Sequence, residues 1–206
     1  MRFIFKTHYN QDIQLAKHSG HVFWYGLLLL LLVLSPVLLD EYWLAQLTFV
    51  LIYGIVGLGL MLLAGFTGLF SIGHAAFLGV GAYTQAVCTQ AGMSFVPALI
   101  CATGLSAAVG VLVGLPALRI KGIYLGIATL SFGFIVEEGM ARWESVTGGN
   151  AGLMVTYPKL GGWTLDSTEE FYFLCLLVTV GATLAIVNLL RSSTGRAFVA
   201  IRDSEI

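Results

Sequence analysis

Long apolar runs are the feature that most restricts how this sequence can fold. Five of them approach the roughly 20 residues that a helix needs to cross a bilayer, and they occupy residues 22–39, 43–64, 95–118, 122–140 and 171–190. Hydrophobic residues make up 58% of the chain and charged residues 10%, against about 25% charged in ordinary soluble domains. A soluble domain of 206 residues could not hide that much apolar surface from water. The runs therefore predict an all-α polytopic membrane protein embedded in a lipid bilayer.

A sixth stretch, residues 69–90, is less plain because it overlaps the glycine-rich sequence GFTGLFSIGHAAFLGVGAY of residues 65–83. The positive-inside rule indicates whether it crosses the membrane. If it crosses, one side of the membrane collects eight basic residues: Arg2, Lys6, Lys17, Arg119, Lys121, Arg191, Arg196 and Arg202. The other side then holds only Arg142 and Lys159, whereas a stretch that does not cross gives five against five. The asymmetry predicts about six spans, a cytoplasmic N-terminus, and one transmembrane domain over residues 1–206.

The glycines of this stretch predict an irregular start to the third span. Each interior glycine costs a helix up to about 1 kcal/mol relative to alanine, so a span that only anchors the chain would not carry five of them. Small residues four apart let helices approach closely in lipid, and three such pairs are Ala75/Gly79, Gly110/Gly114 and Gly122/Gly126. We expect a tightly packed bundle in which the segment Gly65–Gly73 is bent or unwound. Broken spans of this kind recur at transport sites.

Ionisable and hydroxyl side chains inside the spans are the candidates for function. His74 is the one histidine within a span; it is either a pathway or gating residue, or a neutral imidazole hydrogen-bonded to a carbonyl that the bend frees. Glu137 and Glu138 end the fifth span and are expected to face water, with a role at the outer mouth as the alternative. Thr129 and Ser131 are expected to be interhelical hydrogen-bond partners. A membrane enzyme using His74 with a glutamate is disfavoured, because the topology places them at opposite ends of the membrane.

No motif in the sequence signals an enzyme. The patterns G-x-S-x-G and H-E-x-x-H and the P-loop are absent, and Cys88, Cys101 and Cys175 form no metal-ligand spacing with histidine. We expect no catalytic residue, metal or cofactor on this chain, so ATP-driven work would need an ATPase on another chain. The net charge of −1 gives no field that attracts nucleic acid.

Three blocks of the sequence are similar to a known family, the permease subunits of bacterial ABC importers for branched-chain amino acids. The first is GLGLMLLAGFTGLFSIGHAAFLGVGAYTQA, residues 57–86. The second is LRIKGIYLGIATLSFGFIVE, 118–137, continuing into WESVTGGNAGL, 143–153. The third is STGRAFVAIRDSEI, 193–206. The blocks stand in the family's order and cover most of the chain after Tyr53.

The resemblance implies one subunit of a larger importer in the bacterial inner membrane. Its partners would be a second permease subunit, two cytoplasmic ATPases that bind ATP and Mg, and an extracytoplasmic substrate-binding protein. The third block resembles the start of the segment that contacts an ATPase, and the positions carried over are Gly195, Arg196, Ala197, Ile201, Arg202 and Glu205. On the glycine-rich segment, the candidates for the translocation pathway are Thr67, Ser71, Gly73 and His74.

Two matters stay open at the level of sequence. Members of this family continue past the third block with further spans, so the resemblance predicts a domain that is incomplete at its C-terminal end. Permeases for urea and short-chain amides share the first block, and they are an alternative to branched-chain amino acids. A non-transporting membrane protein that assembles with a full-length permease is a further alternative.

Overall fold

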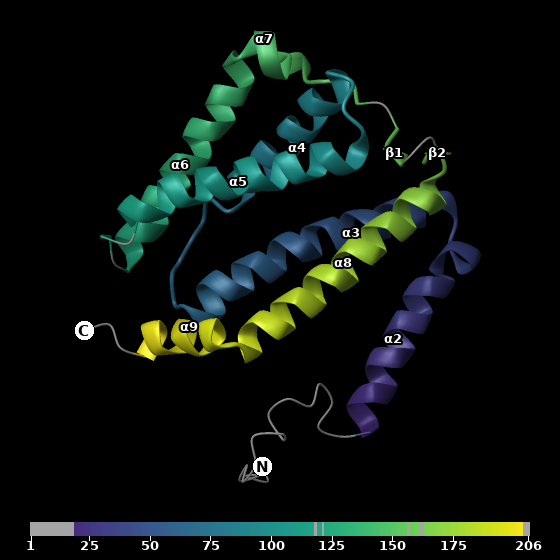
Figure 1. Ribbon diagram of the computed structural model, residues 1–206, viewed down its shortest axis with the longest axis horizontal. Coiled ribbons are helices and arrows are strands. Elements are labelled where there is room, and N and C mark those ends of the chain that lie inside the picture. The colour runs from purple at the N-terminus through teal and green to yellow at the C-terminus, as the bar shows by residue number, and fades with distance from the viewer. Residues whose placement is uncertain (1–18, 118, 121, 156, 161–162, 204–206) are drawn as a thin grey trace. The chain divides into compact units, whose positions relative to one another are not determined.

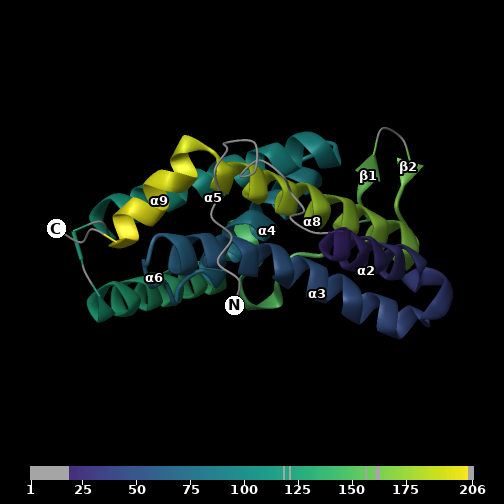
Figure 2. The same ribbon diagram turned by 90° about the horizontal axis from the view of Figure 1, so that it is seen from below.

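Helices account for almost all regular structure in the computed structural model, which describes residues 19–203 except 118, 121, 156, 161 and 162 (Figure 1). In chain order the elements are α2 (Ser19–Leu38), α3 (Glu41–Leu60), the π-helix η1 (Met61–Phe66), α4 (Ala75–Gln90), α5 (Phe95–Ala117), α6 (Ile123–Arg142), α7 (Glu144–Thr147), the 3-10 helix η2 (Gly149–Ala151), strands β1 (Lys159–Leu160) and β2 (Trp163–Thr164), α8 (Thr168–Arg191) and α9 (Ser193–Asp203). The predicted all-α class is confirmed. The antiparallel β1–β2 pair, visible in Figure 2, is a small addition that the sequence did not predict.

Four helices of the described chain are long and apolar enough to cross a membrane. They cover Glu41–Phe66, Phe95–Ala117, Ile123–Arg142 and Thr168–Arg191, and a shorter apolar helix covers Val22–Leu38. Each overlaps a predicted run. In the third predicted span, 69–90, the helix begins only at Ala75 and has 16 residues, because the glycine-rich residues before it are not helical. The crossing of this stretch, and with it the six-span topology, stays a prediction.

The described chain divides into two compact units, and the boundary falls inside α3, between Ile55 and Val56. The first unit contains α2, the N-terminal part of α3, α8 and α9. Its core is formed by Leu44 and Leu51 of α3 with Tyr172, Cys175 and Leu176 of α8. At one end of the pair, the Thr168 hydroxyl donates to a carboxylate oxygen of Glu41 at 2.8 Å. Contacts along the N-terminal part of α3 thus hold it against α8.

A proline inside α2 explains the most buried side chain of this unit. Pro36 has no N–H, so the carbonyl of Leu32, four residues earlier, loses its helical partner. The Tyr172 hydroxyl on α8 donates to this carbonyl at 2.8 Å, and the Ser35 hydroxyl donates to it at 2.8 Å. Tyr172 itself is 0% exposed. The carbonyl that proline frees therefore becomes the point at which α8 attaches to α2.

The second unit contains the rest of α3, η1, α4 to α7, η2 and both strands. Alanines and glycines dominate its buried positions, with Ala98 and Ala102 of α5 at 0% and 3% exposure. A Cβ at Gly81 of α4 would lie 3.2 Å from the Ser106 hydroxyl of α5, and that hydroxyl donates to the Phe77 carbonyl at 3.3 Å. Small residues thus let α4 and α5 approach closely, as expected for helices that pack in lipid.

Replacing Tyr172 with Phe tests the attachment of α8 to α2. We expect a loss of about 0.6 kcal/mol in unfolding free energy, the average for such bonds between membrane helices, because Ser35 still satisfies the carbonyl. Tyr172→Phe combined with Ser35→Ala should cost more than the sum of the single changes, since the buried carbonyl then has no side-chain donor. Denaturant titration of the full chain in detergent measures this. Tyr53→Phe, at a 63% exposed position of α3, is the control; additive single effects would contradict the interpretation.

Candidate functional site

The helical chain is interrupted between η1 and α4, over residues 67–74, here called the break. The π-helix η1 leads into it, and π-helical turns are often found at functional sites. The Thr67 hydroxyl donates to the Leu63 carbonyl at 2.5 Å, which closes the end of η1. Gly68 follows with a φ of 71°, a left-handed conformation that favours glycine. The predicted broken start of the third span is therefore confirmed, two residues later than the predicted Gly65.

Helix α6 holds the break in place through two contacts. The Ile72 backbone N–H donates to the Thr129 hydroxyl at 3.1 Å, and that hydroxyl donates to the Gly126 carbonyl at 2.9 Å. Beside this bond the Gly73 backbone lies directly against the Thr129 carbonyl and next to Gly133, so that a Cβ at Gly73 would overlap the carbonyl. Backbone groups without a helical partner must be satisfied within the protein when they lie in lipid. Thr129 supplies that partner for the middle of the break.

Thr129 forms the expected hydrogen bond to another segment, although its partner lies in the break and not in a helix; the expectation for Ser131 is wrong. The Ser131 hydroxyl donates to the Ile127 carbonyl of its own helix at 3.0 Å, and its side chain is exposed. The two hydroxyls stand two positions apart in the sequence, and a helix turns through about 200° over two positions. Only one of them can therefore face the break.

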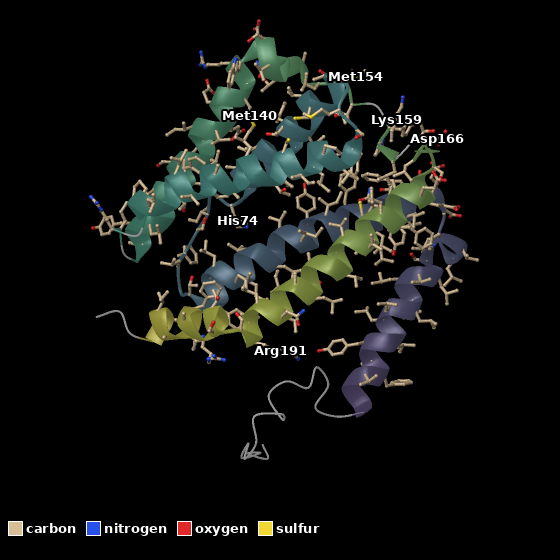
Figure 3. The ribbon with its side chains drawn as sticks, viewed as in Figure 1. His74, Met140, Met154, Lys159, Asp166 and Arg191 are labelled. Atoms are coloured by element: carbon tan, nitrogen blue, oxygen red, sulfur yellow. The ribbon has the colours of Figure 1, made fainter. Side chains whose placement is uncertain are left out.

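His74 ends the break and packs against α3 (labelled in Figure 3). A Cβ built on Gly59 of α3 would lie 3.0 Å from the Nε2 atom of His74, which is closer than ordinary van der Waals contact. Glycine at position 59 therefore leaves space for the imidazole. The ring meets Phe77 edge to face, with centroids 5.9 Å apart. Its Nδ1 atom is buried and has no hydrogen-bond partner among the described residues. The hydrogen bond to a freed carbonyl that one interpretation of His74 expected is therefore not made at Nδ1.

A cavity of about 530 Å³ lies beside the break, between α4, α5 and α6. We call it the His74 pocket. Its described wall is mostly aliphatic and aromatic, and the polar side chains in that wall are Ser71, His74 and Thr129. A volume of this size lies within the range of small-molecule sites, which are typically apolar with a few placed polar groups. The pocket therefore has the composition of a site for a small amphipathic molecule.

A second cavity of about 340 Å³ lies between the break, α4 and α6 and contains Glu137 and Gly73 in its wall. None of its lining residues also lines the His74 pocket. The side chains of Glu137 and Glu138 are exposed, as expected for water-facing groups, and Glu138 forms an ion pair with Arg142. The described structure thus gives no shared pocket in which His74 and Glu137 could act together as an acid–base pair.

The structure separates the four pathway candidates from one another. Ser71 and His74 line the same pocket, Gly73 is the packing contact with α6, and Thr67 closes η1 without lining either cavity. Thr129 joins Ser71 and His74 in the pocket wall. Sequence reasoning placed it on the correct span but did not assign it to the site, because the rotation of α6 about its axis decides which hydroxyl faces the break.

The candidates for ATPase contact form helix α9, which follows α8 after a single residue. Gly195 is buried against the Leu190 backbone, where a Cβ would overlap the carbonyl, so glycine permits the sharp turn between the helices. Arg196, Ala197, Ile201 and Arg202 are exposed on α9, whereas Glu205 lies outside the described residues. The helix thus presents two arginines with an apolar residue, Ile201, that is 54% exposed.

Comparison with known proteins gives one family and two relatives. The family described as the permease component of branched-chain amino acid transport systems matches residues 42–206. The chain is similar to the high-affinity branched-chain amino acid transport system permease protein LivM of Salmonella typhimurium, at 36% identity, and to that of Escherichia coli, at 35%. Each alignment covers 77% of this chain and 43% of the relative, so the chain spans less than half the length of these curated relatives. No solved structure matches.

Two glycine-to-alanine changes should separate the break's contact with α6 from ordinary helix packing. At Gly73 an added Cβ would overlap the Thr129 carbonyl, so Gly73→Ala should destabilise the protein by about 1–3 kcal/mol, as overpacking does. At Gly79 the added Cβ would meet the Met140 sulfur at 3.4 Å, an ordinary contact, so Gly79→Ala should be neutral or gain up to about 1 kcal/mol of helix propensity. Thermal unfolding in detergent compares the two. Equal effects of the two changes would contradict the close approach at Gly73.

Proposed function

Because the chain belongs to the family of branched-chain amino acid transport permease components, we propose that it is a permease subunit of an ABC importer that carries branched-chain amino acids into the bacterial cytoplasm. The observation that carries the proposal is the break, a non-helical segment of an apolar chain that borders the His74 pocket. Non-helical backbone is tolerated at membrane depth where it is buried in protein or lines a cavity. Ser71 and His74 are the residues of the break that face the pathway in this proposal.

The importer would need other chains for energy and substrate delivery. Its partners are a second permease subunit, two cytoplasmic ATPases that bind ATP and Mg, and an extracytoplasmic substrate-binding protein. We assign α9 to the contact with one ATPase. The support is its exposed mixed surface of arginines and Ile201, together with the direct connection of α9 to the long apolar helix α8. A movement of the ATPase would be passed to α8 through the turn at Gly195.

The composition of the His74 pocket favours branched-chain amino acids over urea. Urea is small and polar and carries four N–H hydrogens, so its binding site must supply several acceptors. The described wall of the pocket has three polar side chains, Ser71, His74 and Thr129, and the Thr129 hydroxyl already accepts from Ile72 and donates to Gly126. An aliphatic substrate makes better use of such a wall.

An exchange of segments tests the function without depending on where this chain ends. Residues 1–206 replace the matched region of the Escherichia coli relative, in cells that lack their own copy but keep the other importer components. We expect ATP-dependent uptake of radiolabelled leucine that unlabelled isoleucine and valine inhibit and that urea and acetamide do not. The same exchange with Gly73→Leu, which blocks the contact with α6, is the inactive control. Inhibition by urea, or no leucine uptake by an exchanged protein that inserts and assembles, would refute the proposal.

Thiol labelling tests the proposed orientation, with the N-terminus in the cytoplasm. In a chain whose cysteines at 88, 101 and 175 are replaced, single cysteines are introduced at Ser167 and Ser192, on either side of α8. A membrane-impermeant maleimide should label position 167 from outside intact cells and should label position 192 only after the cells are opened. The opposite pattern would invert the topology, and equal labelling of both positions would show that α8 does not span.

A further inference from the structure

The His74 pocket has a polar side and an apolar side. The polar side chains of its described wall come from the break and α6. The segment of α5 that completes the wall carries no polar side chain: it contributes two glycines together with valine, leucine and alanine side chains, the glycines being Gly110 and Gly114. A molecule with one charged end and one aliphatic end fits this division.

The two glycines of α5 that line the pocket, Gly110 and Gly114, differ from the packed glycines of the same unit. A Cβ at Gly114 would meet no atom within 4 Å, and one at Gly110 would lie 3.8 Å from the Phe77 ring, an ordinary contact. Their helix therefore has room for side chains that it does not carry. Glycine also lowers helix stability relative to alanine, so packing of the described chain gives no reason for glycine at position 114. Open space in the pocket is what these positions provide.

We propose that the His74 pocket receives the aliphatic side chain of the transported amino acid and that Gly110 and Gly114 set the largest side chain it accepts. This inference rests on the function proposed above. The substrate carboxylate then points toward the break, which contributes the Ser71 and His74 side chains to the pocket wall. A serine hydroxyl can donate a hydrogen bond to a carboxylate.

Size selectivity follows from the shape of the pocket. A Cβ added at position 114 meets no neighbour within 4 Å, so a larger side chain there should fill part of the pocket, exclude large substrates and spare small ones. One methylene in an apolar pocket changes discrimination by about tenfold or more. Gly114→Val should therefore lower the kcat/KM for leucine relative to alanine by about tenfold or more, and Gly114→Ala should have an intermediate effect.

The test measures transport of leucine, isoleucine, valine and alanine by the assembled importer that contains this full chain, in the exchanged form described above. The matched control is Gly104→Val, on the same helix, at an exposed glycine where a Cβ also meets nothing within 4 Å and which is absent from the described pocket wall. A second readout needs no transport: a cysteine at position 114, in a chain without other cysteines, is labelled by a small maleimide. Leucine should protect it more strongly than alanine does.

The outcomes separate this inference from the proposed function. If the exchanged protein assembles but transports no branched-chain amino acid, the proposed function fails. If it transports leucine and Gly114→Val leaves the leucine-to-alanine ratio equal to that of Gly104→Val, the pocket does not read substrate size and the inference is overturned. If Gly114→Val does not assemble, Gly114→Ala and the labelling of the cysteine variant decide. Absence of protection by leucine, with transport intact, would mean that another segment occupies the pocket, which also overturns the inference.

Discussion

The hydrogen bond from the Ile72 backbone to the Thr129 hydroxyl is the constraint on which the site depends. A chain that leaves helical geometry in lipid exposes donors and acceptors that no water can satisfy, and each unsatisfied group costs several kcal/mol, on the order of 4–8 by hydrocarbon transfer. Thr129 satisfies the break at its middle, and Gly73 brings the backbone close enough for that bond to form. The positions of Ser71 and His74 follow from this attachment, since they stand immediately before and after the attached residues.

The packing of the helices is typical of a protein surrounded by lipid, which is as apolar as the side chains themselves. The buried positions of the second unit are mainly alanines and glycines, and large aliphatic residues such as Leu112 and Ile135 are exposed at 70%. In water such surfaces would drive aggregation, whereas in lipid they cost nothing. Burial of apolar area therefore explains little of the helix arrangement. Close approach at small residues and a few hydrogen bonds between elements explain more.

The sequence predicted the helices well because their signal is simple. Apolar runs of span length located α3, α5, α6 and α8, and the density of glycine located the break. Three features needed the structure. The choice between Thr129 and Ser131 depends on helix rotation, which apolar runs without a polar face do not reveal. The second feature is the close contact between Gly126 and Phe70: a Cβ built on Gly126 would lie 3.1 Å from the Phe70 ring. Phe70 belongs to the break, whose non-helical backbone has no periodicity from which the direction of a side chain could be predicted. The β1–β2 pair is two residues long on each strand, too short for any alternation to show.

The proline of α2 has a consequence for the order in which the protein is made. The Leu32 carbonyl that Pro36 frees is bound by Tyr172, which is 140 residues further along the chain. A ribosome that adds about 5–20 residues each second completes α2 several seconds before that tyrosine exists. During this interval the Ser35 hydroxyl, on the same helix, is the group that can occupy the carbonyl. Serine at position 35 thus lets α2 enter the membrane early with its backbone satisfied, and the arrival of α8 then converts a local bond into a contact between the first and last long helices of the described chain.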